Sequence, residues 1–396
     1  PTSVQAAVLE DEALGRDLIV SAQTGSGKTV AFGLAMAPQL MAEDGKVLAA
    51  RTPLALVIAP TRELAIQVSR ELTWLYEPTG ARVVSLPLRA KFRGLIEREI
   101  MLFEGPNGWT EWSPFLEYEP EEAATWLAAA IEFGWSELPV AASSAAPKFI
   151  RVNATLPAVA PEQVESVLSR FGEFKTVKIK VAENGQELEQ DLARIAAVRQ
   201  LHPDAKIRLD ANGGFSVNQA RALAARLTDE SAPIEYLEQP VASVGEMAEL
   251  RMHLQPLGIK IAADENVRKA GDPIAVARAQ AADILVLKAA PLGGIARAVE
   301  IAAEAGLPVV VSSAMESSVG LSMGAHLAAT LPDFGFDAGL GTAALMAADV
   351  TREPLKPING QIELRRIEVD PAALDRHKAE EHRIDWWLER LERAWA

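Results

Sequence analysis

Three acidic residues follow successive apolar segments of the sequence at nearly equal intervals: Asp210, Glu238 and Asp264. Carboxylates that converge on one point repel one another unless a cation joins them. The chain contains no cysteine, and no histidine occurs at these positions, so an all-oxygen site favours a hard cation such as Mg²⁺, with Mn²⁺ as a substitute. Each acid alone is as readily explained as a surface or salt-bridged residue, but the three together predict metal ligands.

Lysines flank these acids on both sides in the sequence. Lys178 and Lys180 stand two residues apart in an apolar segment, which is the period at which strand side chains point to the same face. Lys288 follows a later apolar segment. A lysine beside other cations and a metal has a lowered pKa and can act as a base. A metal can also stabilise the enediolate formed when a proton α to a carboxylate is removed. These residue types therefore predict proton abstraction next to a metal-bound carboxylate.

The elements that must position these residues repeat regularly from about Phe149 onward. Apolar strands separated by Ala-rich helices are predicted near Phe149, Val177, Ile207, Ile234, Ile259, Ile284 and Val309. A repeat of one strand and one helix is typical of a (β/α) barrel, whose active site lies at the C-terminal ends of the strands. The acids, the lysines and the pair Ser312-Ser313 all interrupt apolar strands at such ends, so they form the candidate site.

Composition limits the class of function. The chain has 396 residues and a formal net charge of −15. This length predicts two or three domains, and the charge disfavours partners that need a positive surface, such as nucleic acid or an anionic membrane. The lack of cysteine excludes disulfides and thiol nucleophiles. The apolar runs are too short to span a bilayer and no signal peptide is recognised, so a small-molecule substrate and a cytoplasmic location are expected.

The strand-end residues belong to motifs that resemble a known family. These motifs are K-I-K (178–180), L-D-A-N (209–212), E-Y-L-E-Q-P (235–240), A-A-D-E (262–265), V-L-K-A-A-P-L-G-G (286–294) and S-S-A-M-E-S-S-V-G-L (312–321). In order and spacing they resemble the muconate-lactonizing branch of the enolase superfamily. Three further motifs resemble actinobacterial o-succinylbenzoate synthases: P-L-R-A-K-F-R-G (87–94), E-W-S-P-F-L-E-Y (111–118) and V-N-A-T-L-P (152–157). The resemblance covers about residues 86–396.

This resemblance implies a two-domain α/β architecture. A (β/α)7β barrel is expected over residues 146–349, and an α+β capping domain over residues 86–145 together with the tail 350–396. Asp210, Glu238 and Asp264 would ligate Mg²⁺. The loops 89–94 and 111–118 would close over the substrate.

The resemblance also implies roles for the lysines. Lys180 would remove the α-proton of 2-succinyl-6-hydroxy-2,4-cyclohexadiene-1-carboxylate and return it to the departing hydroxyl. Lys178 would hold Lys180 poised, and Lys288 would be a cation on the opposite face.

Four other residues are predicted to contact the substrate: Arg208, Asn212, Ser312 and Ser313. Arg208 shares a strand face with Asp210, so it is expected either to contact the substrate or to order a carboxylate. The two serines are candidates for the succinyl end. An alternative function on the same barrel is a racemase of N-succinyl or N-acyl amino acids, which would use Lys180 and Lys288 as opposed bases.

Residues 1–85 resemble another family, the DEAD-box RNA helicases. A-Q-T-G-S-G-K-T (22–29) resembles their phosphate-binding loop, P-T-S-V-Q (1–5) their adenine-reading motif, and P-T-R-E-L-A (60–65) their first RNA-contacting motif. Strands at 17–22 and 54–59 and a helix at 63–76 would form a partial RecA-like α/β fold. A third strand from Arg82 could belong either to this sheet or to the capping domain. The nucleotide-contacting residues implied by these motifs are Gln5, Gly25, Gly27, Lys28 and Thr29.

The rest of a helicase is missing from the sequence. No D-E-A-D or other Walker B acid follows an apolar strand before the barrel begins, and no second lobe is present. The interpretation is a truncated helicase fragment without functional nucleic-acid binding. A working ATP-binding module, as part of an ATP- or RNA-binding protein, is the alternative from another functional class.

Overall fold

A computed structural model describes most of the chain from residue 81 onward and parts of the preceding segment. The described residues are 81–92, 95–138, 147–229, 233–269 and 271–395, without the side chains of residues 90–95, and, earlier, 2–10, 13, 16, 18–21, 28–41, 55, 57–58, 62, 65, 68 and 72. The chain divides into two compact units. The first is Pro1–Arg82 with Phe103–Pro106, and the second is Val83–Leu102 with Asn107–Ala396.

The first unit contains two described helices. Helix α1 (Ser3–Ala7) begins at a capping box, because the Thr2 side chain accepts from the Gln5 backbone and the Gln5 side chain accepts from Thr2. Helix α2 (Lys28–Leu40) packs Ala31 against Val4 and Val8 of the first segment. The described residues within the predicted strands 17–22 and 54–59 have no regular secondary structure. Strands are stable only with hydrogen-bonded neighbours, and the sequence lacks the remainder of a helicase sheet.

The strand that begins at Arg82 pairs within the capping-domain sheet, which is one of the two assignments that the sequence left open. Strands β1 (Arg82–Phe92), β2 (Leu95–Gly105) and β3 (Gly108–Trp112) form a three-stranded sheet in the order β1-β2-β3. Helix α4 (Pro120–Trp135) follows, where a helix was predicted. Its partner is the C-terminal helix α13 (Glu381–Trp395), from which Trp387 packs edge-on against Trp112 at 5.4 Å between ring centroids.

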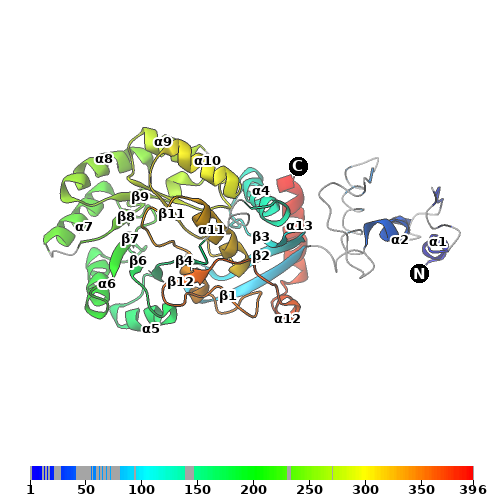
Figure 1. Ribbon diagram of the computed structural model, residues 1–396, viewed down its shortest axis with the longest axis horizontal. Helices are drawn as coiled ribbons and strands as arrows, with labels where there is room; N and C mark the ends of the chain where they lie inside the picture. Colours follow the sequence, from blue (N-terminus) through cyan, green and yellow to red (C-terminus); the bar gives the residue numbers. More distant parts are fainter. Residues whose placement is uncertain are drawn as a thin grey trace. The chain divides into compact units, whose positions relative to one another are not determined.

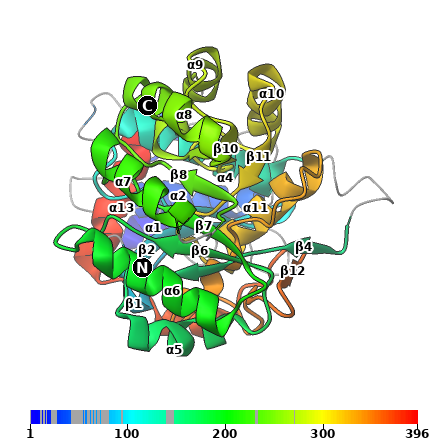
Figure 2. The same cartoon turned by 90° about the vertical axis from the view of Figure 1, so that its left-hand side faces the viewer.

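The second domain is the predicted parallel barrel (Figure 1). Its sheet has the order β11-β10-β9-β8-β7-β6-β5. The strands are β5 (Ala154–Leu156), β6 (Thr176–Lys180), β7 (Lys206–Asp210), β8 (Tyr236–Glu238), β9 (Ile261–Ala263), β10 (Ile284–Leu287) and β11 (Val309–Val311). The helices that follow them are α5 (Val164–Leu168), α6 (Leu188–Leu201), α7 (Val217–Asp229), α8 (Val244–Leu254), α9 (Asp272–Arg278), α10 (Ile295–Ala305) and α11 (Ser318–Thr330). Figure 2 shows helices α5–α10 on the outside of the strands.

The first predicted barrel strand, near Phe149, is wrong. Strand β4 (Phe149–Arg151) pairs antiparallel with β12 (Gln361–Glu363) outside the barrel sheet. Phe149 is 54% exposed and Ile150 only 8%, an alternation typical of a strand with one solvated face, whereas barrel strands are buried on both. Ala338 and Gly339 form parallel bridges to Val152 and Ser312, so this segment joins the two edges of the seven-stranded sheet.

Two glutamates of the capping domain cap helices of the barrel. Glu132 of α4 accepts from the backbone N–H groups of Ile295 and Ala296, at the start of α10. Glu111 of β3 accepts from the backbone N–H groups of Ser317 and Gly320, at the start of α11. A carboxylate at a helix N-terminus satisfies free N–H groups and is favoured by the helix dipole. Both contacts therefore fix the capping domain against the strand ends that carry the candidate site.

Candidate active site

The acids and lysines selected from the sequence lie at the C-terminal ends of successive barrel strands. Lys180 ends β6, Asp210 ends β7 and Glu238 ends β8, and the register pairs Lys180 with Asp210 and Asp210 with Glu238. Asp264 and Lys288 come directly after β9 and β10. The predicted placement of these five side chains on one rim of the barrel is therefore confirmed.

The buried carboxylates and lysines of this rim form ion pairs. Lys178 Nζ lies 2.7 Å from Glu238 Oε1 and 3.2 Å from Asp210 Oδ2. Lys180 Nζ lies 2.6 Å from the same Asp210 oxygen, and Lys288 pairs with Asp264. All these side chains are nearly excluded from solvent. Because burying charges costs several kcal/mol per ion before pairing offsets it, such a cluster is typical of a functional site rather than of a stabilising device.

Crowding of negative charge perturbs the protonation of this cluster. Burial and then the neighbouring Asp210 raise the pKa of Glu238, and although Lys178 opposes the shift the net pKa is about 7. Burial lowers the pKa of Lys178, but Glu238 and Asp210 outweigh it, so the net pKa of Lys178 is well above its usual value. The sequence interpretation expected lysine pKa values lowered by neighbouring cations. For Lys178 the direction is the opposite, because its nearest partners are carboxylates.

One carboxylate oxygen fits the predicted cation. Glu238 Oε2 is buried and has no hydrogen-bond partner within the described part of the chain, and an unsatisfied buried oxygen of this kind is unfavourable unless a cation or donor reaches it. No group of three His, Cys, Asp or Glu side chains among the described residues is arranged to hold a metal ion. Lys178 and Lys180 lie between the carboxylates. The donor chemistry thus fits Mg²⁺, and the ligand assignment stays a prediction.

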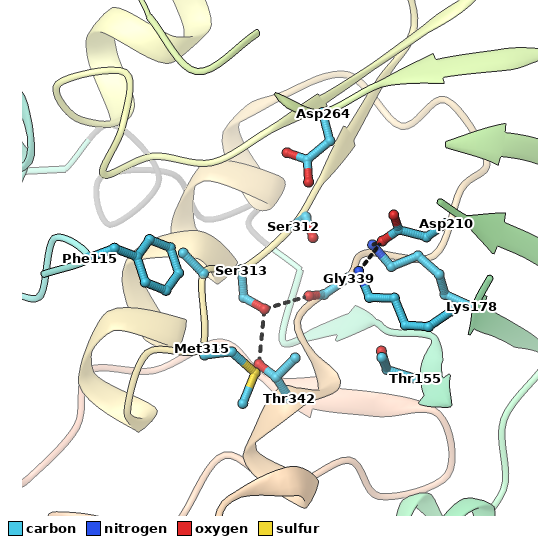
Figure 3. Close-up of a pocket in the computed structure, with 12 residues that line it drawn as sticks. Phe115, Thr155, Lys178, Asp210, Asp264, Ser312, Ser313, Met315, Gly339 and Thr342 are labelled. Carbon is cyan, nitrogen blue, oxygen red and sulfur yellow. Dashed lines mark hydrogen bonds and ion pairs between the residues drawn. The ribbon is translucent and has the colours of Figure 1, made fainter. Parts of the chain in front are cut away.

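A cavity opens beside this cluster at the end of the barrel. The residues that line it are Phe115, Thr155, Lys178, Lys180, Asp210, Asp264, Ser312, Ser313, Ala314, Met315, Gly339 and Thr342. Figure 3 shows Phe115 entering from the capping domain and Lys178 directed toward Asp210. Ser313 Oγ donates to the Gly339 carbonyl at 2.9 Å and lies 2.9 Å from Thr342 Oγ1. Ser312 and Ser313 therefore occupy the wall on which substrate contacts were predicted.

Two predicted substrate contacts have other partners. Arg208 is fully buried below the rim, where it donates to Glu235 at 2.6 Å and to Asn153 at 2.9 Å. Its position supports ordering of the barrel interior, and not a substrate contact, because its side chain does not reach the described cavity wall. Asn212 accepts from Lys180 Nζ at 2.6 Å and donates to Glu265 at 3.1 Å. Its amide is thus directed toward the lysine.

Some cavity residues were not selected from the sequence. Thr155 is a polar residue within the fully buried strand β5 and lies opposite Lys178 in the register. A search for polar residues in short apolar strands would have found it. Thr342 lies in a short 3-10 helix (Gly341–Leu345) and Met315 in an irregular segment, and neither has such a pattern. Of the predicted closing loops, 111–118 supplies Phe115. Residues 89–92 of the other predicted loop belong to strand β1 instead, and residues 93 and 94 lie outside the described residues.

The helicase-like residues are only partly described. Gly25 and Gly27 lie outside the described residues, while Lys28 and Thr29 begin helix α2. The side-chain oxygen of Gln5 accepts from the Thr2 backbone at 2.9 Å. A nucleotide site at this segment therefore stays a prediction.

Comparison with known families agrees with the fold and with the rim of acids and lysines. A family model described as Enolase C-terminal domain-like matches residues 159–368, and one described as Enolase N-terminal domain-like matches residues 83–134. A third, DEAD/DEAH box helicase, matches residues 2–100. The muconate lactonizing enzyme from Pseudomonas fluorescens complexed with muconolactone superposes with a TM-score of 0.64 at 18% identity over 76% of this chain and 98% of that chain. The chain is thus a member of the enolase superfamily.

Its family within that superfamily follows from relatives of much higher identity. The o-succinylbenzoate synthase of Mycobacterium ulcerans (strain Agy99) is 49% identical over 310 residues, which cover 78% of this chain and 91% of that protein. The o-succinylbenzoate synthase of Mycobacterium tuberculosis (strain ATCC 25618 / H37Rv) is 49% identical over 309 residues, with the same coverage. The chain belongs to the o-succinylbenzoate synthase family. No helix in the described ranges has the length and apolarity needed to cross a membrane.

Proposed function

We propose that this protein is an o-succinylbenzoate synthase, which dehydrates 2-succinyl-6-hydroxy-2,4-cyclohexadiene-1-carboxylate to o-succinylbenzoate, a step of menaquinone biosynthesis. The observation that carries the proposal is the position of Lys180. Its side-chain nitrogen lies on the wall of a cavity beside Asp210, at the end of a barrel strand and beneath the capping domain. Serine and threonine hydroxyls also line the cavity, which suits a substrate with two carboxylates.

The metal would be held by Asp210, Glu238 and Asp264. Mg²⁺, or Mn²⁺ in its place, would neutralise the negative charge that develops on the substrate carboxylate when the α-proton is removed. Glu238 Oε2, which has no hydrogen-bond partner among the described residues, supports this assignment, as does the absence of cysteine from the sequence.

Proton transfer is assigned to Lys180. Its neutral amine would take the proton α to the carboxylate, and the resulting ammonium would deliver a proton to the departing hydroxyl on the same face. The C–H and C–O bonds break, water leaves and the ring becomes aromatic. Lys178 keeps a positive charge through its carboxylate partners Glu238 and Asp210. Lys288 would be a fixed cation, and Ser312 and Ser313 would bind the succinyl end.

The racemase alternative needs two opposed bases with equal access to the substrate. Lys288 is paired with Asp264 and is not among the described residues that line the cavity, whereas Lys180 is. This difference favours a reaction in which one lysine performs both proton transfers.

The proposal is tested with two substrates offered to the purified protein with Mg²⁺. The absorbance of the cyclohexadiene substrate should fall as the protein dehydrates it. Racemisation of an N-succinylamino acid should be far slower than this dehydration. Faster racemisation than dehydration, measured as kcat/KM by polarimetry and by absorbance, would assign the barrel to the racemases instead.

We further propose that residues 1–81 take no part in this activity. A chain that starts at Arg82 retains the strand β1, every proposed catalytic residue, the loop 111–118 and helix α13, so it should fold and keep the kcat/KM of the full chain. Soluble yield should rise, because the removed segment exposes large apolar side chains such as Ile19 and Ile58. The measurements are yield, thermal unfolding and kcat/KM with and without ATP. A large loss of activity, or a reproducible effect of ATP, would show an integrated module. The cytoplasmic location and the lack of functional nucleic-acid binding stay predictions.

A further inference from the structure

A continuous chain of hydrogen bonds joins the capping domain to the proposed base. Tyr118, in the loop after β3, accepts from Arg268 Nη1 at 3.1 Å. Arg268 Nη2 donates to Glu265 Oε1 at 2.6 Å, and the same oxygen accepts from Asn212 at 3.1 Å. Asn212 in turn accepts from Lys180 Nζ at 2.6 Å. Five side chains from the capping loop and three βα units are thus connected in one line.

The capping end of this chain is tied to the cavity wall. Tyr118 packs edge-on against Phe115 at 5.5 Å and against Trp126 at 6.1 Å between ring centroids. Phe115 lines the cavity, and Arg98 lies over its ring at 4.4 Å. Arg390 of α13 donates to the backbone carbonyls of Phe115 and Tyr118. A movement of this loop would therefore displace Phe115 and the Tyr118 hydroxyl together.

The barrel end of the chain constrains the lysine. Asn212 has φ of +47°, a left-handed backbone conformation uncommon outside glycine. Its backbone N–H donates to Asp210 Oδ1 at 3.2 Å. With its amide nitrogen held by Glu265, the amide oxygen can only face Lys180. Glu265 thus fixes the direction in which Lys180 Nζ is held, although neither Glu265 nor Arg268 lines the described cavity.

We propose that Tyr118, Arg268 and Glu265 are positioning residues that couple closure of the capping loop 113–118 to the orientation of Lys180. The inference deepens the proposed function, because it takes Lys180 as the base. With the loop closed, Tyr118 holds Arg268 against Glu265, Asn212 is locked, and Lys180 Nζ points to the substrate. With the loop displaced, Arg268 loses its contact with Tyr118 and Lys180 is held less firmly. Lys180 Nζ therefore points to the substrate only when the loop covers the cavity.

Two single variants and a matched control test the coupling. Tyr118→Phe removes one hydroxyl and keeps the aromatic packing, and Arg268→Met removes the link to Glu265. The control is Arg251→Met, because Arg251 pairs with Asp283 at 2.7 Å and these side chains are 23% and 24% exposed, against 21% and 23% for Arg268 and Glu265. Arg251 of α8 pairs with Asp283, which precedes β10 at the opposite end of the strands, and it has no connection to Lys180 in the described contacts.

The expected result is a loss in kcat with little change in KM. Misplacing a reacting group by ~1 Å costs up to ~10²-fold in rate, so each of Tyr118→Phe and Arg268→Met should lower kcat by about tenfold, while Arg251→Met should resemble the wild type. The double variant should be no slower than the slower single variant, because either change interrupts the same chain. Multiplicative effects, or an equal loss in Arg251→Met, would overturn the coupling.

A second readout needs no turnover. The rate of carbamylation of Lys180 by cyanate, followed by peptide mass spectrometry of the Mg²⁺-loaded protein with exposed Lys206 as internal reference, reports how firmly the amine is held. The rate should rise severalfold in Tyr118→Phe and Arg268→Met and stay unchanged in Arg251→Met. If the wild type failed to dehydrate the cyclohexadiene substrate, the proposed function would fall while this result still decided the coupling. Unchanged Lys180 reactivity in both variants would overturn it.

Discussion

Replacing Lys180 with alanine should reduce kcat by at least ~10²–10⁴-fold, the contribution usual for general acid–base catalysis. The reduction should reach or exceed the upper end of this range, because Lys180 is assigned both the removal of the α-proton and the protonation of the leaving hydroxyl. The fold should survive, since Asp210 keeps Lys178 as a partner at 3.2 Å. Circular dichroism, thermal unfolding and metal titration would establish that only the chemistry has changed.

Lys288→Ala is the matched comparison for this loss. Lys288, like Lys180, is a buried lysine that follows a barrel strand and is paired with one of the three acids. If dehydration uses one base, Lys288→Ala should lose less activity than Lys180→Ala. The loss in Lys288→Ala should come only from poorer positioning of the substrate. Exchange of the substrate α-proton with deuterated solvent should depend on Lys180 and not on Lys288. Activity of Lys180→Ala within tenfold of the wild type would remove that residue from the role of base.

Local patterns in the sequence were sufficient to predict the rim of the site. Acids and lysines that interrupt apolar strands must lie at strand ends, and consecutive parallel strands bring those ends together, so Lys180, Asp210 and Glu238 could be placed without any knowledge of tertiary contacts. The same logic predicted seven strand-and-helix repeats. It failed at Phe149, because a short apolar strand looks the same whether it joins the barrel or pairs antiparallel with a distant segment such as β12.

Contacts between distant segments could not be predicted in this way. Arg208 has the right strand face for a substrate contact, but its depth below the rim depends on Glu235 and Asn153, which no periodicity connects to it. The link from Tyr118 to Arg268 joins residues 150 positions apart and depends on the packing of two domains. Side-chain direction at such places is determined by tertiary packing, and sequence spacing carries no information about it.

Removal of divalent metal should abolish the dehydration, and Mg²⁺ or Mn²⁺ should restore it. Lys178 pairs with both Asp210 and Glu238, Lys180 pairs with Asp210 and Lys288 pairs with Asp264. Burial together with Asp210 raises the pKa of Glu238 to about 7. A cation at the unpartnered Glu238 Oε2 would relieve both the repulsion and the missing hydrogen bond. Hard oxygen ligands predict that Mg²⁺ and Mn²⁺ restore activity better than soft metals do.

Glu238→Gln separates loss of the metal from general damage to the site. The amide keeps the size of the side chain and a carbonyl oxygen, but it removes the charge that would bind the cation. Replacing a residue that hydrogen-bonds to a metal ligand already lowers metal affinity by ~10–100-fold. Loss of a direct ligand should therefore weaken Mg²⁺ binding by at least ~100-fold in calorimetric titration. The matched control is Glu235→Gln, which changes a neighbouring acid whose partners are Arg208 and Lys206 on the side away from the rim. Equal metal affinity in Glu238→Gln and wild type, or full activity after exhaustive chelation, would contradict the assignment of Asp210, Glu238 and Asp264.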